Sequence, residues 1–198
     1  MSVSFNFDFP RTRAAITYLA SKDIPELTKY KLCKLLFLAD KFHLVKYGRV
    51  ITGDKYYAVP NGPIPSRTLN LLNAVIDPTS GVDEQARVLG ETLELDRQYE
   101  NPRFKAAMAF DATNISQSDV MALDKVVAEY GGMGFGELKA ITHAMCAYKV
   151  PWNERPEGMN RAEMDFVMFF EEDSDAIAGA RDAMLEDDSL RKAFPVSQ

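Results

Sequence analysis

The sequence predicts an α+β fold that is mainly helical, a single compact domain of helices with a few short antiparallel strands. Apolar residues recur at helical spacing over most of the chain, and the alternation typical of strands is confined to short segments. The 198 residues, 46% hydrophobic and 26% charged, are enough to bury one core and are typical of a globular protein.

The N-terminal segment alternates apolar and polar side chains from Val3 to Phe9. This period of two predicts an edge strand that ends at Pro10, because proline cannot continue a hydrogen-bonded ladder. The alternative is an arm that docks on a partner. Residues 11–21 then predict a short helix, so residues 1–27 are expected to form an N-terminal strand and helix.

A long helix is predicted from a cap at Thr28 to about Tyr47, with Gly48 as the residue that ends it. A turn at residues 52–54 should lead into a strand over residues 55–59. The run PNGPIP at residues 60–65 contains three prolines and predicts a stiff loop. Ser66 is then expected to cap a helix over residues 66–76, with Leu69, Leu72 and Ile76 facing inward.

The second half predicts a loop over residues 77–86, strands over 87–95 and 103–110, and a helix that ends at Tyr130. Ser116 and Asp119 have the spacing of a capping box at the start of this helix. The glycines between 131 and 136 follow a helix rather than a strand, which indicates a helix end and a tight turn instead of a phosphate loop. A helix over about 136–148 should stop before Pro151, and the tail from Arg161 is helical in pattern.

Charge and composition limit the classes of function. The net charge of −6 makes direct nucleic-acid binding a poor candidate, since such binding requires basic residues that neutralise phosphates. The two cysteines, Cys33 and Cys146, lie in apolar helical patterns and are expected to be reduced thiols of a cytoplasmic protein. Neither a signal peptide nor a run of 18 apolar residues occurs in the sequence, so no membrane association is expected.

Two pairs of residues have the types and spacing that a metal site or a catalytic site could use. Asp40 and His43 lie three apart on the long helix, and His143 and Cys146 repeat that spacing. If the two helices packed face to face, these four side chains could surround zinc, or a cysteine with a histidine could act as a nucleophile. The alternative, which we favour, is a buried and hydrogen-bonded Asp40–His43 pair with no metal or other cofactor and no catalytic residue.

Two further features indicate protein–protein binding. Tyr56 and Tyr57 are adjacent on the predicted strand, so one ring should be buried and the other should face outward beside the rigid loop. Between Glu163 and Asp188, ten acidic residues stand against one arginine, a net charge of −9 that would complement a basic partner. We therefore predict a partner site that comprises Tyr56, Tyr57, Asn61, Ile64, Glu171, Glu172 and Asp173.

The stretch from Lys31 to Ser66, KLCKLLFLADKFHLVKYGRVITGDKYYAVPNGPIPS, resembles the signature of the Panacea (SocA-like) antitoxin domain family. A looser similarity runs from Ile115 to Trp152, so the resemblance covers roughly residues 28–155 and leaves residues 156–198 as an acidic helical tail packed on the same domain. The motif residues that the resemblance marks as structural are Asp40, His43, Gly48, Thr52, Gly53, Asp54, Gly62, Pro63 and Pro65.

The resemblance implies a function. It implies a non-enzymatic antitoxin of a type II toxin–antitoxin system, bacterial or phage-associated, that neutralises a cognate protein toxin by direct binding. Some members are thought to act instead as adaptors that deliver the toxin to a cellular protease. The rival from a different class is a metal-dependent or cysteine enzyme that uses Asp40, His43, His143 and Cys146.

Overall fold

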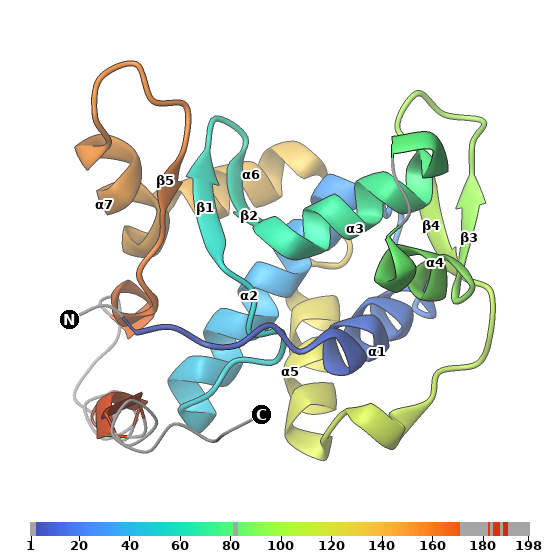
Figure 1. Cartoon of the computed structure of the whole chain (residues 1–198), viewed down its shortest axis with the longest axis horizontal. Coiled ribbons are helices and arrows are strands. Elements are labelled where there is room, and N and C mark those ends of the chain that lie inside the picture. Colours follow the sequence, from blue (N-terminus) through green and yellow to red (C-terminus); the bar gives the residue numbers. More distant parts are fainter. Residues whose placement is uncertain (1–2, 81–82, 171–181, 183, 187, 190–198) are drawn as a thin grey trace.

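The computed structural model describes residues 3–80, 83–170, 182, 184–186 and 188–189. It confirms a compact, mainly helical α+β domain, with helices arranged around one long helix and with two small antiparallel sheets (Figure 1). The helices are α1 (Phe9–Ala20), α2 (Lys29–Tyr47), α3 (Ser66–Ile76), α4 (Glu84–Gly90), α5 (Gln117–Tyr130), α6 (Phe135–Ala144) and α7 (Cys146–Glu154), with short 3₁₀ helices η1 (Pro78–Ser80), η2 (Ala112–Asn114) and η3 (Phe166–Phe170).

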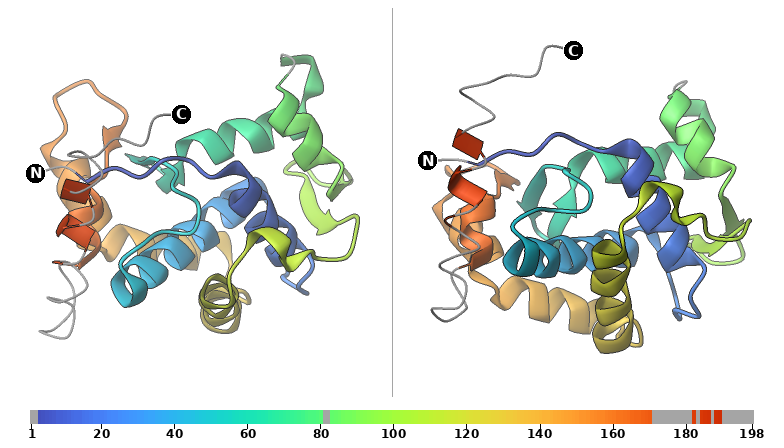
Figure 2. Two further views of the ribbon diagram at one scale, coloured as in Figure 1. Left: turned by 60° about the horizontal axis from the view of Figure 1, so that its bottom comes forward. Right: turned by 90° about the horizontal axis from the view of Figure 1, so that it is seen from below.

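Helix α2 forms the centre of the molecule, and its predicted ends are confirmed. The hydroxyl of Thr28 accepts a hydrogen bond from the N–H of Lys31, and Gly48 adopts a left-handed φ of 72° while its N–H bonds to the carbonyl of Leu44 at 2.8 Å. Every residue from Lys31 to Asp40 is buried. A helix buried on all sides has to lie in the interior, and α2 crosses the middle of the molecule in both views of Figure 2.

The first sheet has the strand order β2-β1-β5, built from β1 (Tyr56–Val59), β2 (Gly62–Pro65) and β5 (Ala162–Glu163). The predicted loop over residues 60–65 is therefore wrong for residues 62–65, which form β2. The N–H of Ser66 bonds to the carbonyl of Lys55, so in the antiparallel register the nitrogens of Pro63 and Pro65 point away from β1. Both prolines are tolerated because β2 is an edge strand.

The second sheet is the hairpin of β3 (Leu93–Asp96) and β4 (Arg103–Ala106), which confirms two strands in this region but shortens both. Helix α4 precedes β3 where a loop and the start of a strand were predicted. Its start is capped by Asp83, whose carboxylate accepts from the N–H groups of Gln85 and Ala86. This helix covers α3 and is only seven residues long, too short for its periodicity to be read from the sequence.

The N-terminal segment does not form the predicted strand. Residues 3–8 pair with no strand of the described chain, and α1 begins at Phe9 with Pro10 in its first turn, where a missing N–H costs nothing. The side chain of Asp8 caps this helix by accepting from Arg11 N at 2.9 Å. The alternation is instead used for packing: Val3 is buried, and the ring of Phe5 lies edge-on to that of Phe166 at 5.0 Å.

The predicted helix over residues 136–148 is divided into two. Met145 has an extended conformation between α6 and α7, and α7 continues through Pro151 instead of ending before it. The tail from Arg161 begins as strand β5, which was not predicted, and continues into the short 3₁₀ helix η3, so it is helical only from Phe166 to Phe170; most of residues 171–198 lie outside the described part. The capping box at Ser116 and Asp119 is confirmed at the start of α5.

One hydrophobic core joins the whole described chain. It contains α1 and α2 side chains together with Val3 near the N-terminus and Met164, Phe166, Phe169, Phe170 and Met184 near the C-terminus. Among the described residues, no helix has the length and apolar character required to cross a membrane.

Candidate functional site

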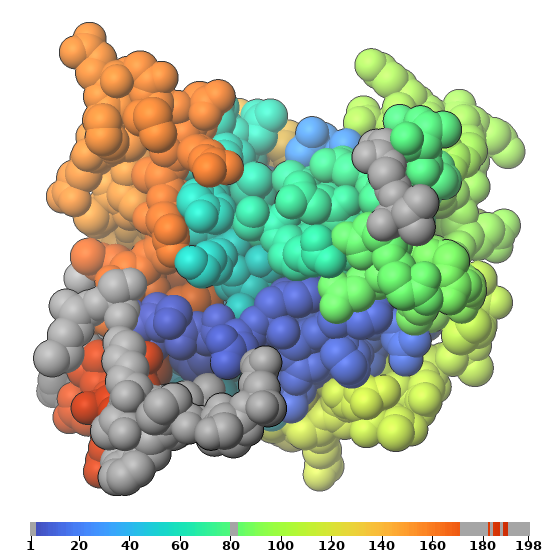
Figure 3. Space-filling view, viewed as in Figure 1, coloured from blue at the N-terminus to red at the C-terminus, as the bar shows by residue number. Residues whose placement is uncertain are grey.

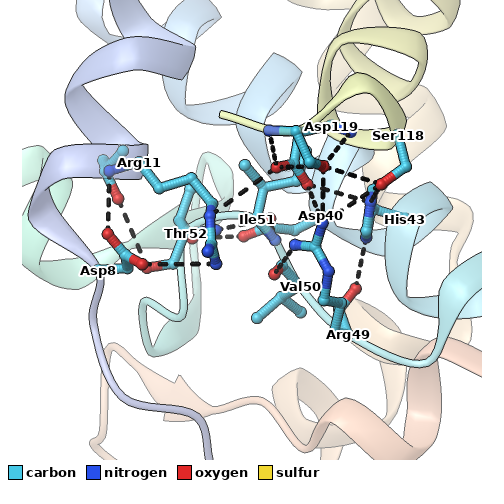
Figure 4. A network of polar contacts seen from close by, with 12 residues as sticks. Asp8, Arg11, Asp40, His43, Arg49, Val50, Ile51, Thr52, Ser118 and Asp119 are labelled. Atoms are coloured by element: carbon cyan, nitrogen blue, oxygen red, sulfur yellow. Dashed lines mark hydrogen bonds and ion pairs between the residues drawn. The ribbon is translucent and has the colours of Figure 1, made fainter. Parts of the chain in front are cut away.

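Asp40 is a buried residue of α2 whose side chain lies at the centre of the turn that follows the helix (Figure 4). One carboxylate oxygen accepts from the backbone N–H groups of Ile51 and Thr52 at 2.7 and 3.1 Å. The other accepts from the hydroxyl of Thr52 and from that of Tyr56, the latter at 2.8 Å. Burial raises the pKa of Asp40, against the opposing effect of these four hydrogen bonds. Asp40 therefore fixes the chain between α2 and β1.

Asp54 plays the corresponding role for α3. Its carboxylate accepts from the N–H groups of Arg67 and Thr68 at 3.0 and 2.7 Å, so it supplies the cap that was predicted for Ser66. Ser66 is the first helical residue and makes no side-chain cap bond. Burial raises the pKa of Asp54, while its hydrogen bonds to the N–H groups of α3 act in the opposite direction.

His43 is buried and hydrogen-bonded as predicted, but its partner is Asp119 rather than Asp40. Its Nδ1 lies 2.8 Å from the carbonyl of Arg49, and its Nε2 lies 3.0 Å from the Ser118 hydroxyl and 3.1 Å from Asp119 Oδ1. Arg49 Nη2 is 2.8 Å from the same oxygen. Arg49 and Asp119 lie side by side in Figure 4. Burial would raise the pKa of Asp119, but the bonds from His43 and Ser116 and the charge of Arg49 hold it well below its ordinary value.

Of the four residues of the zinc or cysteine-enzyme hypothesis, Asp40 and His43 are engaged by other groups of the protein. Both carboxylate oxygens of Asp40 and both ring nitrogens of His43 have partners in the protein, whereas His143 stacks on Tyr148 with ring centroids 4.1 Å apart. The described part of the chain holds no group of three histidine, cysteine or acidic side chains arranged to bind a metal. Cys33 lies in the core, where burial raises its thiol pKa to about 12.

The two adjacent tyrosines face opposite ways, as predicted. Tyr56 is 1% exposed and packs edge-on to Phe37, so it supports the sheet from beneath and forms no part of the surface. Tyr57 is half-buried on the outer side, opposite Ile64 of β2 and Glu163 of β5. We call this outer side the sheet face: Tyr57, Val59, Ile64 and Glu163, with Asn61 at the hairpin tip.

The sheet face lies open at the front of the molecule. In the space-filling view the hairpin (cyan) is visible between the orange segment that contains β5 and the green segment that contains α3 (Figure 3). The Tyr57 hydroxyl donates to Glu163 at 3.4 Å, and the guanidinium of Arg161 lies 4.9 Å from the Tyr57 ring centroid. The structure thus brings Tyr57, Asn61 and Ile64 together on one hairpin, while the predicted site residues Glu171, Glu172 and Asp173 lie outside the described residues.

A second polar cluster, at the tip of the hairpin, was not predicted as a site. Lys34 is 2% exposed, and its amine donates to the carbonyl of Asn61 at 2.5 Å, while Lys139 donates to the side-chain oxygen of Asn61 at 3.0 Å. The sequence signal for Lys34 is a charged residue within an otherwise apolar helical run. Lys139 has no such signal, because a lysine on a half-exposed helix face is ordinary.

Comparison with known proteins supports the resemblance seen in the motif. The sequence model of the family described as "Antitoxin SocA-like, Panacea domain" matches residues 32–149. No curated protein and no solved structure matches the chain. The matched segment covers more than half of the 198 residues and contains most of α2 and the whole β1–β2 hairpin. The chain therefore belongs to the SocA-like antitoxin family and carries its Panacea domain.

Proposed function

We propose that this protein is the antitoxin of a type II toxin–antitoxin system and neutralises a cognate protein toxin by direct binding in the cytoplasm. The observation that carries the proposal is the family match over residues 32–149, which supports a non-enzymatic antitoxin role with a toxin as the partner. The fixed positions of Asp40 and His43 agree with this, since both side chains are used to hold the fold.

The sheet face is the surface that we propose for toxin binding. Tyr57 is held by the flanking strands and by Glu163, so its ring loses little side-chain entropy when it is covered. Tyrosine is among the residues that dominate binding energies at protein interfaces. The two prolines of β2 stiffen the hairpin that presents Tyr57, Asn61 and Ile64.

The acidic segment is proposed as a second contact. The net charge of −9 between Glu163 and Asp188 would attract a basic surface and speed the encounter with it. A toxin that acts on RNA or nucleotides presents such a surface, because it must bind phosphates. On this proposal Glu171, Glu172 and Asp173 set the rate of association, and Tyr57 sets the lifetime of the complex.

Co-expression with the neighbouring gene tests the proposal. If that gene encodes the toxin, its expression should stop growth, and the wild-type chain should restore growth and co-purify with the toxin. Tyr57→Ala should abolish or strongly reduce both effects, whereas Tyr99→Ala should not, although Tyr99 is 46% exposed on the loop between β3 and β4. Wild-type protein that neither rescues growth nor binds the product would contradict the antitoxin role.

The same experiment separates neutralisation by binding from delivery to a protease. Binding predicts that the toxin persists at an unchanged level in rescued cells, bound to the antitoxin. An adaptor predicts that the toxin disappears when the antitoxin is present and persists when the protease is absent.

A further inference from the structure

The turn of the β1–β2 hairpin is held by two lysines that come from different helices. Lys34 of α2 binds the Asn61 carbonyl from the interior, and Lys139 of α6 binds the Asn61 side chain from the surface. Asn61 itself is exposed and Lys139 is half-buried, so the cluster begins at the surface and continues to a buried amine.

Gly62 allows these groups to come close to the turn. It has a φ of +99°, and a Cβ at this position would lie 2.7 Å from Lys34 Nζ, 3.2 Å from Thr142 Oγ1 and 3.3 Å from His143 Cδ2. Any larger residue would therefore displace the Lys34 amine. The position brings Lys34 of α2 and His143 of α6 to one point of the fold.

His143 contributes a polar atom without a partner. Its Nε2 is buried and makes no hydrogen bond within the described structure, while its ring is held by stacking on Tyr148. The hydroxyl of Tyr148 is in turn fixed by donation to the carbonyl of Val59 at 2.9 Å. A buried ring nitrogen without a partner is costly in free energy, unless a ligand completes its hydrogen bonds.

The cluster is cationic and lacks a counter-ion. Within the described residues, no carboxylate pairs with Lys34 or Lys139, although the chain as a whole is acidic. Burial lowers the pKa of Lys34 to about 8, and the charge of Lys139 acts in the same direction. The pKa of His143 is also lowered, by burial and then by the charges of Lys139 and Lys34. An anion beside these groups would relieve the repulsion among them.

We propose that this cluster, composed of Lys34, Asn61, Lys139 and His143, is a binding site for a carboxylate carried by an acidic side chain of the toxin. The inference rests on the proposed function and adds a specific recognition contact to it. The site adjoins the sheet face through the same hairpin, so one partner can cover both. A single acidic side chain on a folded partner fits this site better than a polyanion, because the net charge of −6 repels an extended chain of phosphates.

The test is the affinity of the purified antitoxin for the product of the neighbouring gene. Lys139→Gln should weaken binding at least tenfold, because it removes the surface cation. Asn61→Ala should also weaken binding. Lys105→Gln is the matched control on the second sheet, where Lys105 is exposed, and it should change the affinity less than twofold. Circular dichroism should show that all three variants remain folded.

A double-mutant cycle then identifies the source of the carboxylate. Each acidic residue of the toxin is changed to its amide, and one of these changes should weaken binding to the wild type but have no further effect on Lys139→Gln. Lys139→Gln that binds as tightly as the wild type would overturn the site while leaving the antitoxin role intact. A weakened Lys139→Gln without any coupled toxin residue would overturn the assignment to a toxin carboxylate. Wild-type protein that binds no toxin would instead contradict the proposed function itself.

Discussion

Asp40 illustrates how a motif residue of a type found in metal and catalytic sites can instead stabilise the fold. A carboxylate in α2 accepts four hydrogen bonds from a segment that begins eleven residues later, and all four donors are buried with it. A buried charge is tolerated only when donors surround it in this way. The sequence predicted the burial of Asp40 but not its partners, because the backbone N–H groups of Ile51 and Thr52 have no residue-specific signal.

Substitution of Asp40 should destabilise the protein according to how many donors it leaves unpaired. Asp40→Ala should lower the free energy of unfolding by about 3 kcal/mol or more, since four buried donors lose their acceptor. Asp40→Asn should cost less, because the amide oxygen can still accept and the two hydroxyls can rotate. Urea denaturation measures both. Glu94→Ala, on the exposed side of β3, is the control and should change stability by about 0.5 kcal/mol or less.

Lys34 should give the protein a stability that rises at alkaline pH. Its pKa is about 8 in the folded protein and about 10.4 in an unfolded chain, so the unfolded state binds more protons between these values. Stability therefore increases with pH across this window, by up to roughly 3 kcal/mol for a shift of this size. The measurement is the difference in unfolding free energy between wild type and Lys34→Met from pH 7 to about 10.5.

That difference should rise with pH in favour of the wild type over this whole range. The comparison with Lys34→Met removes the contribution of other groups that titrate in the same range. Lys105→Met, at an exposed position, should show no such slope relative to wild type. A flat difference for Lys34→Met would mean that the buried amine keeps its ordinary pKa.

At the scale of secondary-structure elements, the sequence correctly predicted the helix ends that local hydrogen bonds fix. Thr28, Gly48 and the Ser116–Asp119 capping box fix helix ends through bonds within a few residues, and all three were confirmed. The predictions were wrong where residues farther along the chain determine the local structure. Asp54 caps α3 from the preceding turn. Apolar side chains of the alternating segment 3–9 pack on the core, and the segment does not pair with a neighbouring strand among the described residues. The prolines of β2 are tolerated only because their nitrogens face the open edge.

Gly53 is the residue that seats the N-terminal segment on the turn after α2. It has a φ of +64°, and a Cβ there would lie 1.9 Å from the carbonyl oxygen of Asn6. Two residues further along the segment, Asp8 N–H bonds to the carbonyl of Thr52 at 2.9 Å. The segment (blue) passes over this turn (cyan) in Figure 2. The packing of the segment therefore depends on the absence of a side chain at position 53.

Gly53→Ala should destabilise the protein by about 2 kcal/mol or more, because it adds backbone strain to a clash with main-chain atoms. It should also speed hydrogen exchange at the Asp8 amide, since the segment must move to make room. Gly132→Ala is the matched control: nothing lies within 4 Å of its added Cβ, and its stability should stay within about 0.5 kcal/mol of wild type. Normal exchange at Asp8 in Gly53→Ala would show that the segment is seated by other contacts.

At the scale of the whole molecule, the segment that matches the family model is shorter than the part of the chain that contributes to the hydrophobic core. The family match covers residues 32–149, yet the core around α2 includes side chains from both flanking regions. Phe169 is fully buried with its ring centroid 5.3 Å from that of Phe37, and β5 pairs with β1. Ile16 and Leu19 of α1 are fully buried as well. The division into residues 1–27, 28–155 and 156–198 follows the resemblance, whereas the packing crosses both boundaries.

The fragment 32–149 should therefore fail to fold cooperatively when it is produced alone. Without α1, β5 and η3, apolar side chains of α2 and β1 such as Phe37 and Ala58 would be exposed to water, which costs more free energy than a domain of this size has available. We expect the fragment to lack a sigmoidal thermal transition by circular dichroism and to show poorly dispersed amide resonances. In the full chain, Phe169→Ala should lower the free energy of unfolding by about 3–5 kcal/mol, and Val167→Ala, at a half-buried neighbour, by about 1 kcal/mol. A cooperative transition in the fragment would show that the flanking regions are additions to a self-sufficient domain.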